Sequence, residues 1–362
     1  MLRKTRFVCV SDTHGYTPSE AGFKLPAGDV LIHAGDLTKN GSTAELRKTM
    51  AWISEANFEI KIIVAGNHDI TLDPEFYAKH GQSFHSRLED PQQCIDIVSG
   101  SSPSVVYLQH QAAIIRLIRP DGPNTMFKVF GSPYSQSEGN WAFGLDSKDT
   151  NALWNQIPLD VDILVTHTPP QSHCDQKPTG MLVGCNALRQ TLRRIRPLLS
   201  VCGHVHEGRG YERVRWRSLV ATENGGVDDD DITTPGFLPP LGSKKQSLVD
   251  LTGKSIPSLD NTGFSGSAVA QCDFLEMSPM SPPSSIGQPA AFSILKSIVP
   301  TVNAGSHVVD HGCAAQTLRR ETCIVNAAIM ATSWPHRGGK RFHAPIVVDV
   351  HLPVRQEGDP KR

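Results

Sequence analysis

Five short polar motifs, each following an apolar run, constrain the fold of this chain more than any other feature. In chain order they are Asp12-Thr13-His14, Gly35-Asp36, Gly66-Asn67-His68-Asp69, His167 and Gly203-His204-Val205-His206. Loops at the carboxyl ends of the strands of an open α/β sheet converge on one crevice, and such folds bind ligands there. The repeated order of strand and polar motif therefore predicts an α/β fold whose motif residues meet at one edge of the sheet.

Hydrophobic periodicity supports this fold between and beyond the motifs. A capping box at residues 42–45 predicts a helix, with Leu46, Met50 and Ile53 at helical spacing. A second helix is predicted at residues 185–195. We expect strands at residues 7–10, 29–33, 60–64, 105–108, 112–118, 127–130, 161–166, 198–202, 211–220, 322–329 and 345–350.

A long stretch in the second half of the chain has a different composition. Residues 228–231 are four consecutive acids, after which Gly, Ser and Pro dominate. A segment without periodicity cannot bury enough apolar surface to offset the entropy lost on ordering. We therefore expect one domain, residues 1–352, interrupted by a disordered insertion at about 222–318, with a tail at 353–362. In this hypothesis the insertion is dispensable for chemistry and is a candidate site for an unknown protein partner.

Overall charge and hydrophobicity exclude several classes of protein. The 362-residue chain carries 35 Lys and Arg against 36 Asp and Glu, which argues against bulk nucleic acid or an anionic membrane as a partner. No apolar stretch approaches the roughly 20 residues of a membrane span. Residues 1–6 run directly into the first strand and leave no room for a signal peptide. The cysteines show no CxxC spacing, which favours reduced thiols. We expect a soluble cytoplasmic protein.

The residue types in the motifs indicate a metal site. Carboxylate, amide oxygen and imidazole are ligands for hard and borderline divalent ions, and none of the motifs contains cysteine. Two ions about 3.5–4 Å apart need a shared carboxylate, and Asp36, alone at the end of its strand, is the natural bridge. Asp12 and His14, two positions apart, can face one ion. Asn67 offers a neutral oxygen, and His204 and His206 could serve different ions.

Two further motif residues suggest acid catalysis. His68 follows Asn67 directly and could protonate a leaving alkoxide. Asp69 could orient that imidazole and stabilise its charge, as carboxylates beside metal centres do. We therefore predict His68 and Asp69 as catalytic residues.

The motifs together resemble the signature of the calcineurin-like metallophosphoesterase superfamily, over residues 5–221 and 320–352. The metallophosphoesterase-domain-containing (MPPED-like) branch is the most similar in the segments Ser11-Asp12-Thr13-His14, Phe130-Gly131-Ser132-Pro133-Tyr134, Thr166-His167-Thr168-Pro169-Pro170, Val183-Gly184-Cys185 and His206-Glu207-Gly208. Some members of that branch lack the histidine that matches His204. This chain has it, which favours activity.

This resemblance implies a fold and a set of ligands. The implied fold is a four-layer α/β/β/α sandwich of two mixed sheets. Two divalent or transition metal ions (Mn, Fe or Zn) are implied, with His68 as the catalytic histidine. One ion would be held by Asp12, His14, Asp36 and His206, and the other by Asp36, Asn67, His167 and His204.

The resulting hypothesis is a metal-dependent phosphoesterase acting on a small-molecule phosphodiester, cyclic nucleotides included. A phosphomonoesterase and a nucleotide-binding regulator or interaction protein with low turnover stay open as alternatives. A protein Ser/Thr phosphatase is disfavoured, because the corresponding stretches at residues 35–40 and 65–69 contain no arginine.

Three other features have a structural and a functional interpretation. His173, six residues after His167, could reach the cleft, although a structural role is favoured. Residues 140–143 could form an aromatic platform, and we favour a packed loop. Four arginines form a basic face on the predicted helix, and we favour a solvated surface over a phosphate site there. They are Arg189, Arg193, Arg194 and Arg196.

Overall fold

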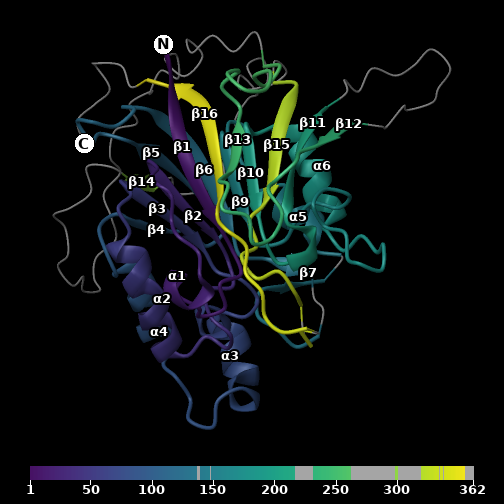
Figure 1. Ribbon diagram of the computed structural model, residues 1–362. Helices are drawn as coiled ribbons and strands as arrows, with labels where there is room; N and C mark the ends of the chain where they lie inside the picture. The colour runs from purple at the N-terminus through teal and green to yellow at the C-terminus, as the bar shows by residue number, and fades with distance from the viewer. Residues whose placement is uncertain are drawn as a thin grey trace, which may run out of the picture.

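Two large β-sheets pack face to face, and helices cover the outer face of each (Figure 1). This arrangement confirms the expected four-layer α/β/β/α sandwich of two mixed sheets. The structure is a computed structural model, and it describes residues 1–136, 139–146, 148–216, 231–261, 298–300, 319–333, 335–336 and 338–354.

The first sheet has the strand order β13-β16-β1-β2-β3-β4. Neighbours from β1 to β4 run parallel, and β16 is antiparallel to β1. The parallel order brings the carboxyl ends of β1, β2 and β3 to one edge, directly before the first three motifs. The strands are β1 (Leu2–Val10), β2 (Val30–Ala34), β3 (Ile60–Val64), β4 (Val105–Tyr107), β13 (Ser247–Asp250) and β16 (Ile346–Pro353).

The second sheet has the order β12-β11-β15-β10-β9-β6-β5-β14. Its central strands β6, β9, β10 and β15 are parallel, so β9 and β10 deliver the last two motifs to one edge. The bounds are β5 (Gln111–Arg116), β6 (Met126–Ser132), β9 (Ile163–Thr166), β10 (Leu199–Cys202), β11 (Gly210–Arg215), β12 (Ile232–Pro235), β14 (Ile298–Pro300) and β15 (Glu321–Asn326). A short separate pair consists of β7 (Ser135–Gln136) and β8 (Gly144–Leu145).

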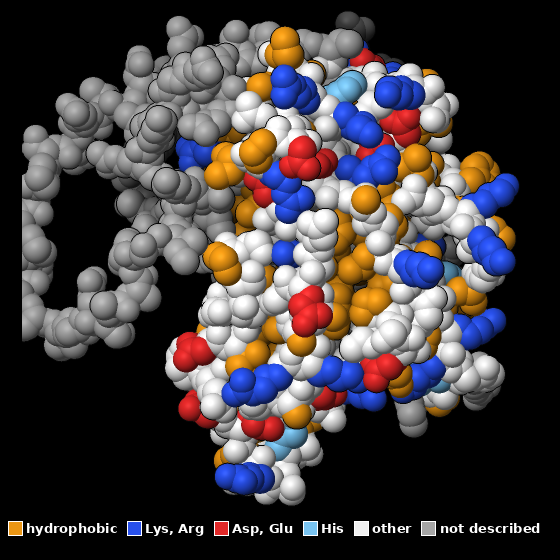
Figure 2. All heavy atoms as spheres, turned by 60° about the vertical axis from the view of Figure 1, so that its left-hand side comes forward, with side chains coloured by type: hydrophobic (Ala, Val, Ile, Leu, Met, Phe, Trp, Pro, Cys, Tyr) orange, Lys and Arg blue, Asp and Glu red, His pale blue; other side chains and the backbone are white. Residues whose placement is uncertain are grey.

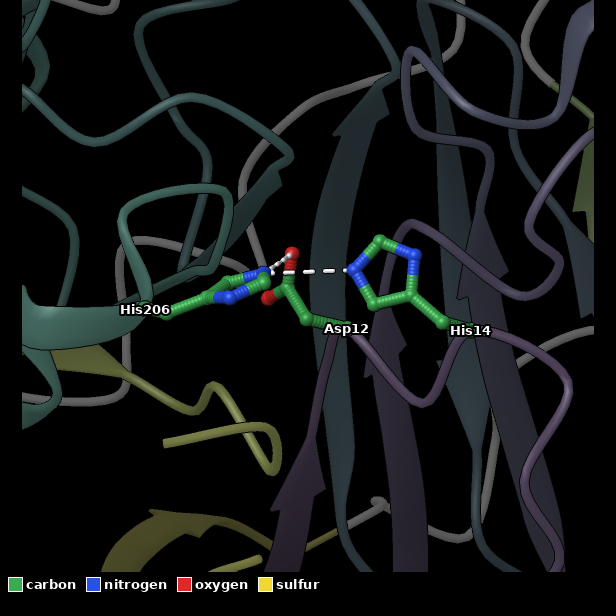
Figure 3. Close-up of side chains that lie close together, drawn as sticks. All are labelled: Asp12, His14 and His206. Atoms are coloured by element: carbon green, nitrogen blue, oxygen red, sulfur yellow. Dashed lines mark hydrogen bonds and ion pairs between the residues drawn. The ribbon is translucent and has the colours of Figure 1, made fainter. Parts of the chain in front are cut away.

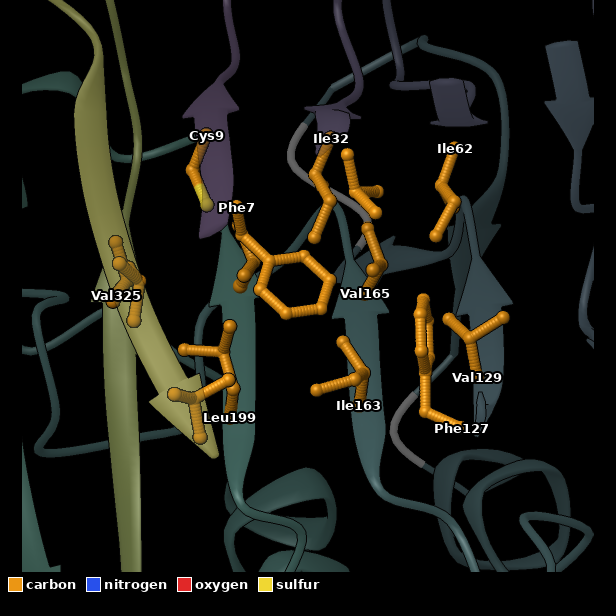
Figure 4. Packing of buried hydrophobic residues seen from close by; sticks show 14 of the residues in the cluster. Phe7, Cys9, Ile32, Ile62, Phe127, Val129, Ile163, Val165, Leu199 and Val325 are labelled. Carbon is orange, nitrogen blue, oxygen red and sulfur yellow. The ribbon is translucent and has the colours of Figure 1, made fainter. Parts of the chain in front are cut away.

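Alternating side chains of the strands build the layer between the sheets (Figure 4). Phe7 of β1 and Phe127 of β6 meet there edge to face, with ring centroids 5.4 Å apart. Val8 and Val10 point to the opposite face of the first sheet and pack in the second cluster, under the helices. Each large apolar side chain buried in this way stabilises the fold by about 1.5–3 kcal/mol.

Helices form the two outer layers. The first sheet carries α2, α3 and α4, and the second carries α5 and α6. Helix α2 begins at the predicted capping box, where Ser42 accepts from the backbone N–H of Glu45 and Glu45 reaches back to that of Ser42. The helices are α1 (Pro18–Ala21), α2 (Thr43–Glu55), α3 (Pro74–His80), α4 (Pro91–Ser99), α5 (Thr150–Trp154) and α6 (Asn186–Ile195), with 3-10 turns η1 (Ile70–Leu72), η2 (Gly81–Ser83) and η3 (His206–Gly208).

An ion pair joins strand β16 to strand β1, in addition to their backbone pairing. Asp349 of β16 accepts two hydrogen bonds, each 2.7 Å long, from the Nε and Nη2 atoms of Arg6 in β1. This two-point geometry is the strongest form of an arginine–carboxylate pair. It holds β16 in register beside β1 at the centre of the sheet.

Part of the predicted disordered insertion is ordered, so that prediction is wrong for residues 231–261 and 298–300. In these ranges β12 pairs with β11, β13 with β16, and β14 with β5. Local composition does not reveal that unpaired sheet edges elsewhere in the chain offer hydrogen-bond partners. Residues 222–230, 262–297 and 301–318 lie outside the described residues, as do 355–362 of the predicted tail.

Acidic, basic and apolar side chains are interspersed over the described residues on the side that Figure 2 presents. On α6 the basic face is partly paired: Arg189 and Arg193 lie 3.8 and 3.6 Å from the Asp231 carboxylate. Among the described residues, no helix is long and apolar enough to cross a membrane.

Leu251 tests whether the segment after β13 belongs to the core. Leu251 is 3% exposed in the layer between the sheets, whereas Leu248 on β13 is 39% exposed. Leu251→Ala should lower the free energy of unfolding by about 2–5 kcal/mol. The matched control Leu248→Ala should cost less than about 1 kcal/mol. Urea unfolding measures both, and equally small losses would show that this segment does not pack on the core.

Candidate metal centre

The seven predicted ligands converge where the carboxyl edges of the two sheets meet. Strand β1 leads into Asp12 and His14, β2 into Asp36, β3 into Asn67, β9 into His167, and β10 into His204 and His206. Six of the seven are buried and His204 is half-buried. Buried carboxylates and imidazoles at this density require mutual pairing or a cation.

One group of ligand atoms surrounds Asp12 (Figure 3). His206 Nε2 lies 3.5 Å from Asp12 Oδ1 and 3.2 Å from His14 Nε2. His14 Nε2 is in turn 3.6 Å from Asp36 Oδ2. Asp12, His14 and His206 each offer one ligand atom, and these three atoms lie within 4.8 Å of one another, so the residues could hold one metal ion.

A second group surrounds Asn67. His167 Nε2 lies 3.4 Å from Asp36 Oδ1 and 3.0 Å from Asn67 Oδ1. His204 Nδ1 approaches the same Asn67 oxygen at 2.9 Å. The structure therefore brings Asp36, Asn67, His167 and His204 together, and Asp36 contributes one oxygen to each group.

Unusual backbone conformation aims these side chains at the centre. Asp12, His14, Asp36 and His204 all have positive φ, between 44° and 66°. L-residues with side chains rarely adopt this region, and each such residue costs of order 1–3 kcal/mol. Strain of this kind clusters at functional sites, so the turns after β1, β2 and β10 are shaped for the ligands and not for stability.

The glycines of three motifs stand where no side chain fits. A Cβ atom at Gly35 would lie 2.4 Å from His167 Nδ1, and one at Gly66 would lie 2.2 Å from Asp36 Oδ1. At Gly203 a Cβ would lie 2.3 Å from Asp12 Oδ2 and 2.0 Å from Ser11 Oγ. The glycines that precede Asp36, Asn67 and His204 thus each let another ligand approach the backbone.

Backbone carbonyls set the orientation of two imidazoles. His167 Nδ1 donates to the carbonyl of Ala34 at 2.9 Å, and His206 Nδ1 donates to that of Thr332 at 3.0 Å. A carbonyl can only accept, so Nδ1 carries the proton and Nε2 of the neutral ring presents a lone pair to the centre. The role of Thr332 could not be predicted from the sequence, because a residue of any type can supply a backbone carbonyl.

Electrostatics at the centre favour charged carboxylates. Burial raises the pKa of Asp12, but the hydrogen bond and charge of His206 outweigh it and lower that pKa to about 2. Burial also opposes the charge on His206, yet Asp12 raises its pKa to about 9. Burial lowers the pKa of His14 to about 3, which leaves its imidazole neutral. On binding a metal ion, His206 would release its Nε2 proton, and ionised carboxylates beside neutral imidazoles are a donor set that fits divalent metal ions.

His68 reaches the centre from its rim. Its Nδ1 donates to the carbonyl of Lys39 at 2.7 Å, and its backbone N–H donates to Asp36 Oδ1 at 2.9 Å. The imidazole lies over Trp141, with ring centroids 4.0 Å apart, and edge-on to His14. A ligand atom of His68 lies within 4.8 Å of those of His14 and Asp36, although its side chain is half-buried.

Asp69 does not orient His68, so that part of the prediction is wrong. Its carboxylate accepts from Thr38 Oγ1 and from the backbone N–H groups of Leu37, Thr38 and Gly66, at 2.7–3.1 Å. The Lys39 carbonyl holds the imidazole instead. Adjacent positions in a tight turn point to different sides, and Asp69 points beneath the turn after β2. It ties that turn to the one after β3.

The structure favours one interpretation for His173 and for the loop at residues 140–143. His173 is buried, and its Nδ1 lies 3.0 Å from Glu212 Oε2 of β11, which favours the structural role. The loop at residues 140–143 packs against the site: Trp141 lies on His68, and the backbone N–H of Ala142 donates to the Asn67 carbonyl.

Comparison with known sequences adds an independent observation. A family model described as calcineurin-like phosphoesterase matches residues 5–208. Human metallophosphoesterase domain-containing protein 1 is 39% identical over 213 residues, which are 57% of this chain and 62% of that protein. A probable rhamnogalacturonate lyase C of Emericella nidulans is 43% identical over 213 residues, 58% of this chain and 18% of that protein. The chain thus spans less than two thirds of either relative.

A solved structure is also similar in part. The purple acid phosphatase of yellow lupin seeds matches with a TM-score of 0.30 and 13% sequence identity. The match covers 61% of this chain and 40% of the phosphatase chain.

Gly66→Ala tests the close approach beneath the centre. The new methyl group would overlap Asp36 Oδ1 and the Asp36 backbone nitrogen, so Asp36 must move and metal affinity should fall by about tenfold or more. Gly210→Ala is the control, since its nearest neighbour would be 3.9 Å away. Metal content after dialysis, measured by mass spectrometry, decides. Equal metal retention in both variants would contradict the steric argument.

Proposed function

Because this chain belongs to the calcineurin-like phosphoesterase family, we propose that it is a hydrolase that cleaves phosphodiesters with two divalent metal ions. The proposed substrates are small molecules and include cyclic nucleotides. The match to a family model over residues 5–208, together with the candidate metal-ligand groups, supports this proposal.

The observation that carries the proposal is the position of Asp36. One of its carboxylate oxygens lies 3.6 Å from His14 Nε2 and the other lies 3.4 Å from His167 Nε2. A carboxylate placed between two ligand groups could serve both ions of a pair, with one oxygen for each. Asp12, His14, Asp36 and His206 would hold one ion, and Asp36, Asn67, His167 and His204 the other.

The chain's own residues divide the remaining work. When bound, the ions supply an activated water as nucleophile and stabilise the charge that develops on the phosphoryl oxygens. Asn67 contributes an oxygen without adding negative charge, which keeps the centre attractive to an anionic ester. His68, held at Nδ1 by the Lys39 carbonyl, turns Nε2 towards the centre; in its protonated form that atom can donate a proton to the leaving oxygen.

The proposal extends to the cellular setting. Six described cysteines are free, and five of them are buried, which suits a reducing compartment. We propose a cytoplasmic enzyme with neither a membrane nor bulk nucleic acid as partner. The two iron, zinc or manganese ions are part of the same proposal, with Mn²⁺ as the first to test.

A substrate panel tests the function directly. Aryl phosphodiesters, aryl phosphomonoesters and cyclic nucleotides are assayed with Mn²⁺ added and with chelator. Faster metal-dependent release from the diesters supports the proposal. Preference for monoesters would assign the chain to phosphomonoesterases, and tight nucleotide binding without turnover would make it a regulator.

Asp36→Asn should reduce kcat by several orders of magnitude, because one substitution weakens both ligand groups and the residues act as a unit. Metal content should fall below two ions per chain in the same preparation. Asp96→Asn is the matched control, since Asp96 is exposed on α4. A near-normal rate with full metal content would rule out the two-metal hypothesis.

His68→Ala should lower the rate while leaving metal content nearly unchanged. An acid matters most for poor leaving groups, so we expect a loss of about 100-fold or more on alkyl esters and a small loss on nitrophenyl esters. His351→Ala, an exposed histidine on β16, is the control. Equal losses on both esters would argue against the acid role, and loss of metal would make His68 a ligand.

A further inference from the structure

Two lysines flank one aromatic ring at the rim of the metal centre. Lys39 Nζ lies 4.9 Å from the centroid of the Tyr16 ring, and Lys340 Nζ lies 5.1 Å from it. Tyr16 is half-buried and both lysines are exposed. Tyr16 and Lys340 are 324 positions apart in the sequence, so only the fold brings the three residues together.

Each member of this cluster belongs to a segment that also builds the centre. Tyr16 follows His14 by two positions. The Lys39 carbonyl accepts from His68 Nδ1. Lys340 lies on the hairpin after β15, closed by pairing of Met330 with Phe342, and the same hairpin provides the Thr332 carbonyl for His206. The cluster therefore lies beside the ligand group of His14 and His206.

The ring is held in place and its hydroxyl is polarised. Phe342 packs against Tyr16 with ring centroids 5.0 Å apart. Lys340 Nζ donates to the Tyr16 hydroxyl oxygen at 2.8 Å. An ammonium group has no acceptor, so the tyrosine O–H proton is left to donate to a third group.

The positive charges of the cluster have no described counter-ion. Among the residues that the structure describes, neither lysine ammonium forms an ion pair. Glu45 lies under this loop, but its carboxylate accepts from the backbone N–H groups of Lys39 and Asn40 and from Ser42 Oγ. Two ammonium groups around one ring repel each other, and an anion between them would remove that cost. To an incoming anion the cluster offers the ammonium groups and the tyrosine O–H as donors.

We propose that Tyr16, Lys39 and Lys340 bind a second phosphate group of the substrate, away from the phosphorus that is cleaved. This inference rests on the proposed function, and it narrows the substrate class to phosphodiesters that also carry a phosphate monoester. The lysines supply charge, and the tyrosine hydroxyl supplies a directed hydrogen bond.

A matched pair of substrates tests the proposal. Thymidine 5′-(4-nitrophenyl phosphate) and its 3′-phosphorylated form differ only in the second phosphate, and both release nitrophenol. The unmodified chain should prefer the 3′-phosphorylated ester in kcat/KM by about tenfold. Lys39→Ala and Lys340→Ala should each reduce that ratio about two- to fivefold, the range of exposed charge pairs, and added salt should reduce it further.

Two controls separate charge recognition from structural damage. Lys48→Ala removes a lysine already paired with Glu20 and should keep the ratio. Tyr16→Phe keeps the ring against Phe342 and removes only the hydroxyl, so it should reduce the ratio by a smaller factor. Variants that lower kcat/KM equally on both substrates, or an unmodified chain without preference, would overturn the proposal.

A binding measurement keeps this inference distinct from the proposed function. Calorimetry compares thymidine 3′,5′-bisphosphate with thymidine 5′-phosphate on the metal-depleted full chain and on the lysine variants. Tighter, lysine-dependent binding of the bisphosphate without any turnover of the metal-loaded chain would refute the enzyme and support the anion site. Turnover with equal binding of the two nucleotides would support the enzyme and refute the site.

Discussion

The whole centre depends on how closely the two sheets approach each other at their carboxyl edges. Gly66 lies against Asp36 and the ring of His167, and Gly203 lies against Asp12, so ligands from one sheet rest on the backbone of the other. A Cβ atom at either position would lie 2.0–2.7 Å from its nearest neighbouring atoms, which is too close, so a side chain there would push the two edges apart. The positive φ of Asp12, Asp36 and His204 belongs to the same constraint, because it turns each side chain into the narrow space. The packed layer between the sheets offsets that strain.

Much of this arrangement could be predicted from the sequence because its signals are local. Apolar runs such as residues 60–64 show strand character within a few positions, and the polar motif that follows marks the strand end. Parallel order then implies that Asp12, Asp36 and Asn67 share an edge. The capping box at Ser42 is equally local and begins α2. The ligand set follows from residue type, since carboxylate, amide and imidazole at strand ends have few other uses in such density.

The rest depends on partners that are distant in sequence. The carbonyls of Thr332 and Lys39 orient His206 and His68, and any residue could supply them. Asp69 follows His68 directly, yet it hydrogen-bonds the turn after β2, because direction within a tight turn is decided by packing. Strand β13 has little hydrophobic pattern of its own; its position is set by the open edge of β16. Secondary-structure propensity is a property of an isolated segment, whereas these contacts form only in the assembled fold.

The pairing of Arg6 with Asp349 has a consequence for the order of folding. These residues are 343 positions apart, so β1 is made long before the strand that completes its pairing. At about 5–20 residues per second, a ribosome needs about 20–70 s to make the intervening chain. During that time β1 has one long edge unpaired, and the hairpin that holds His206 does not exist. Contacts between residues so far apart in the sequence slow folding, because the chain loses the entropy of loop closure before the contacts can form. The candidate metal centre is thus completed only after the hairpin that follows β15 has been made, and a nascent chain interrupted before β16 would display an aggregation-prone edge.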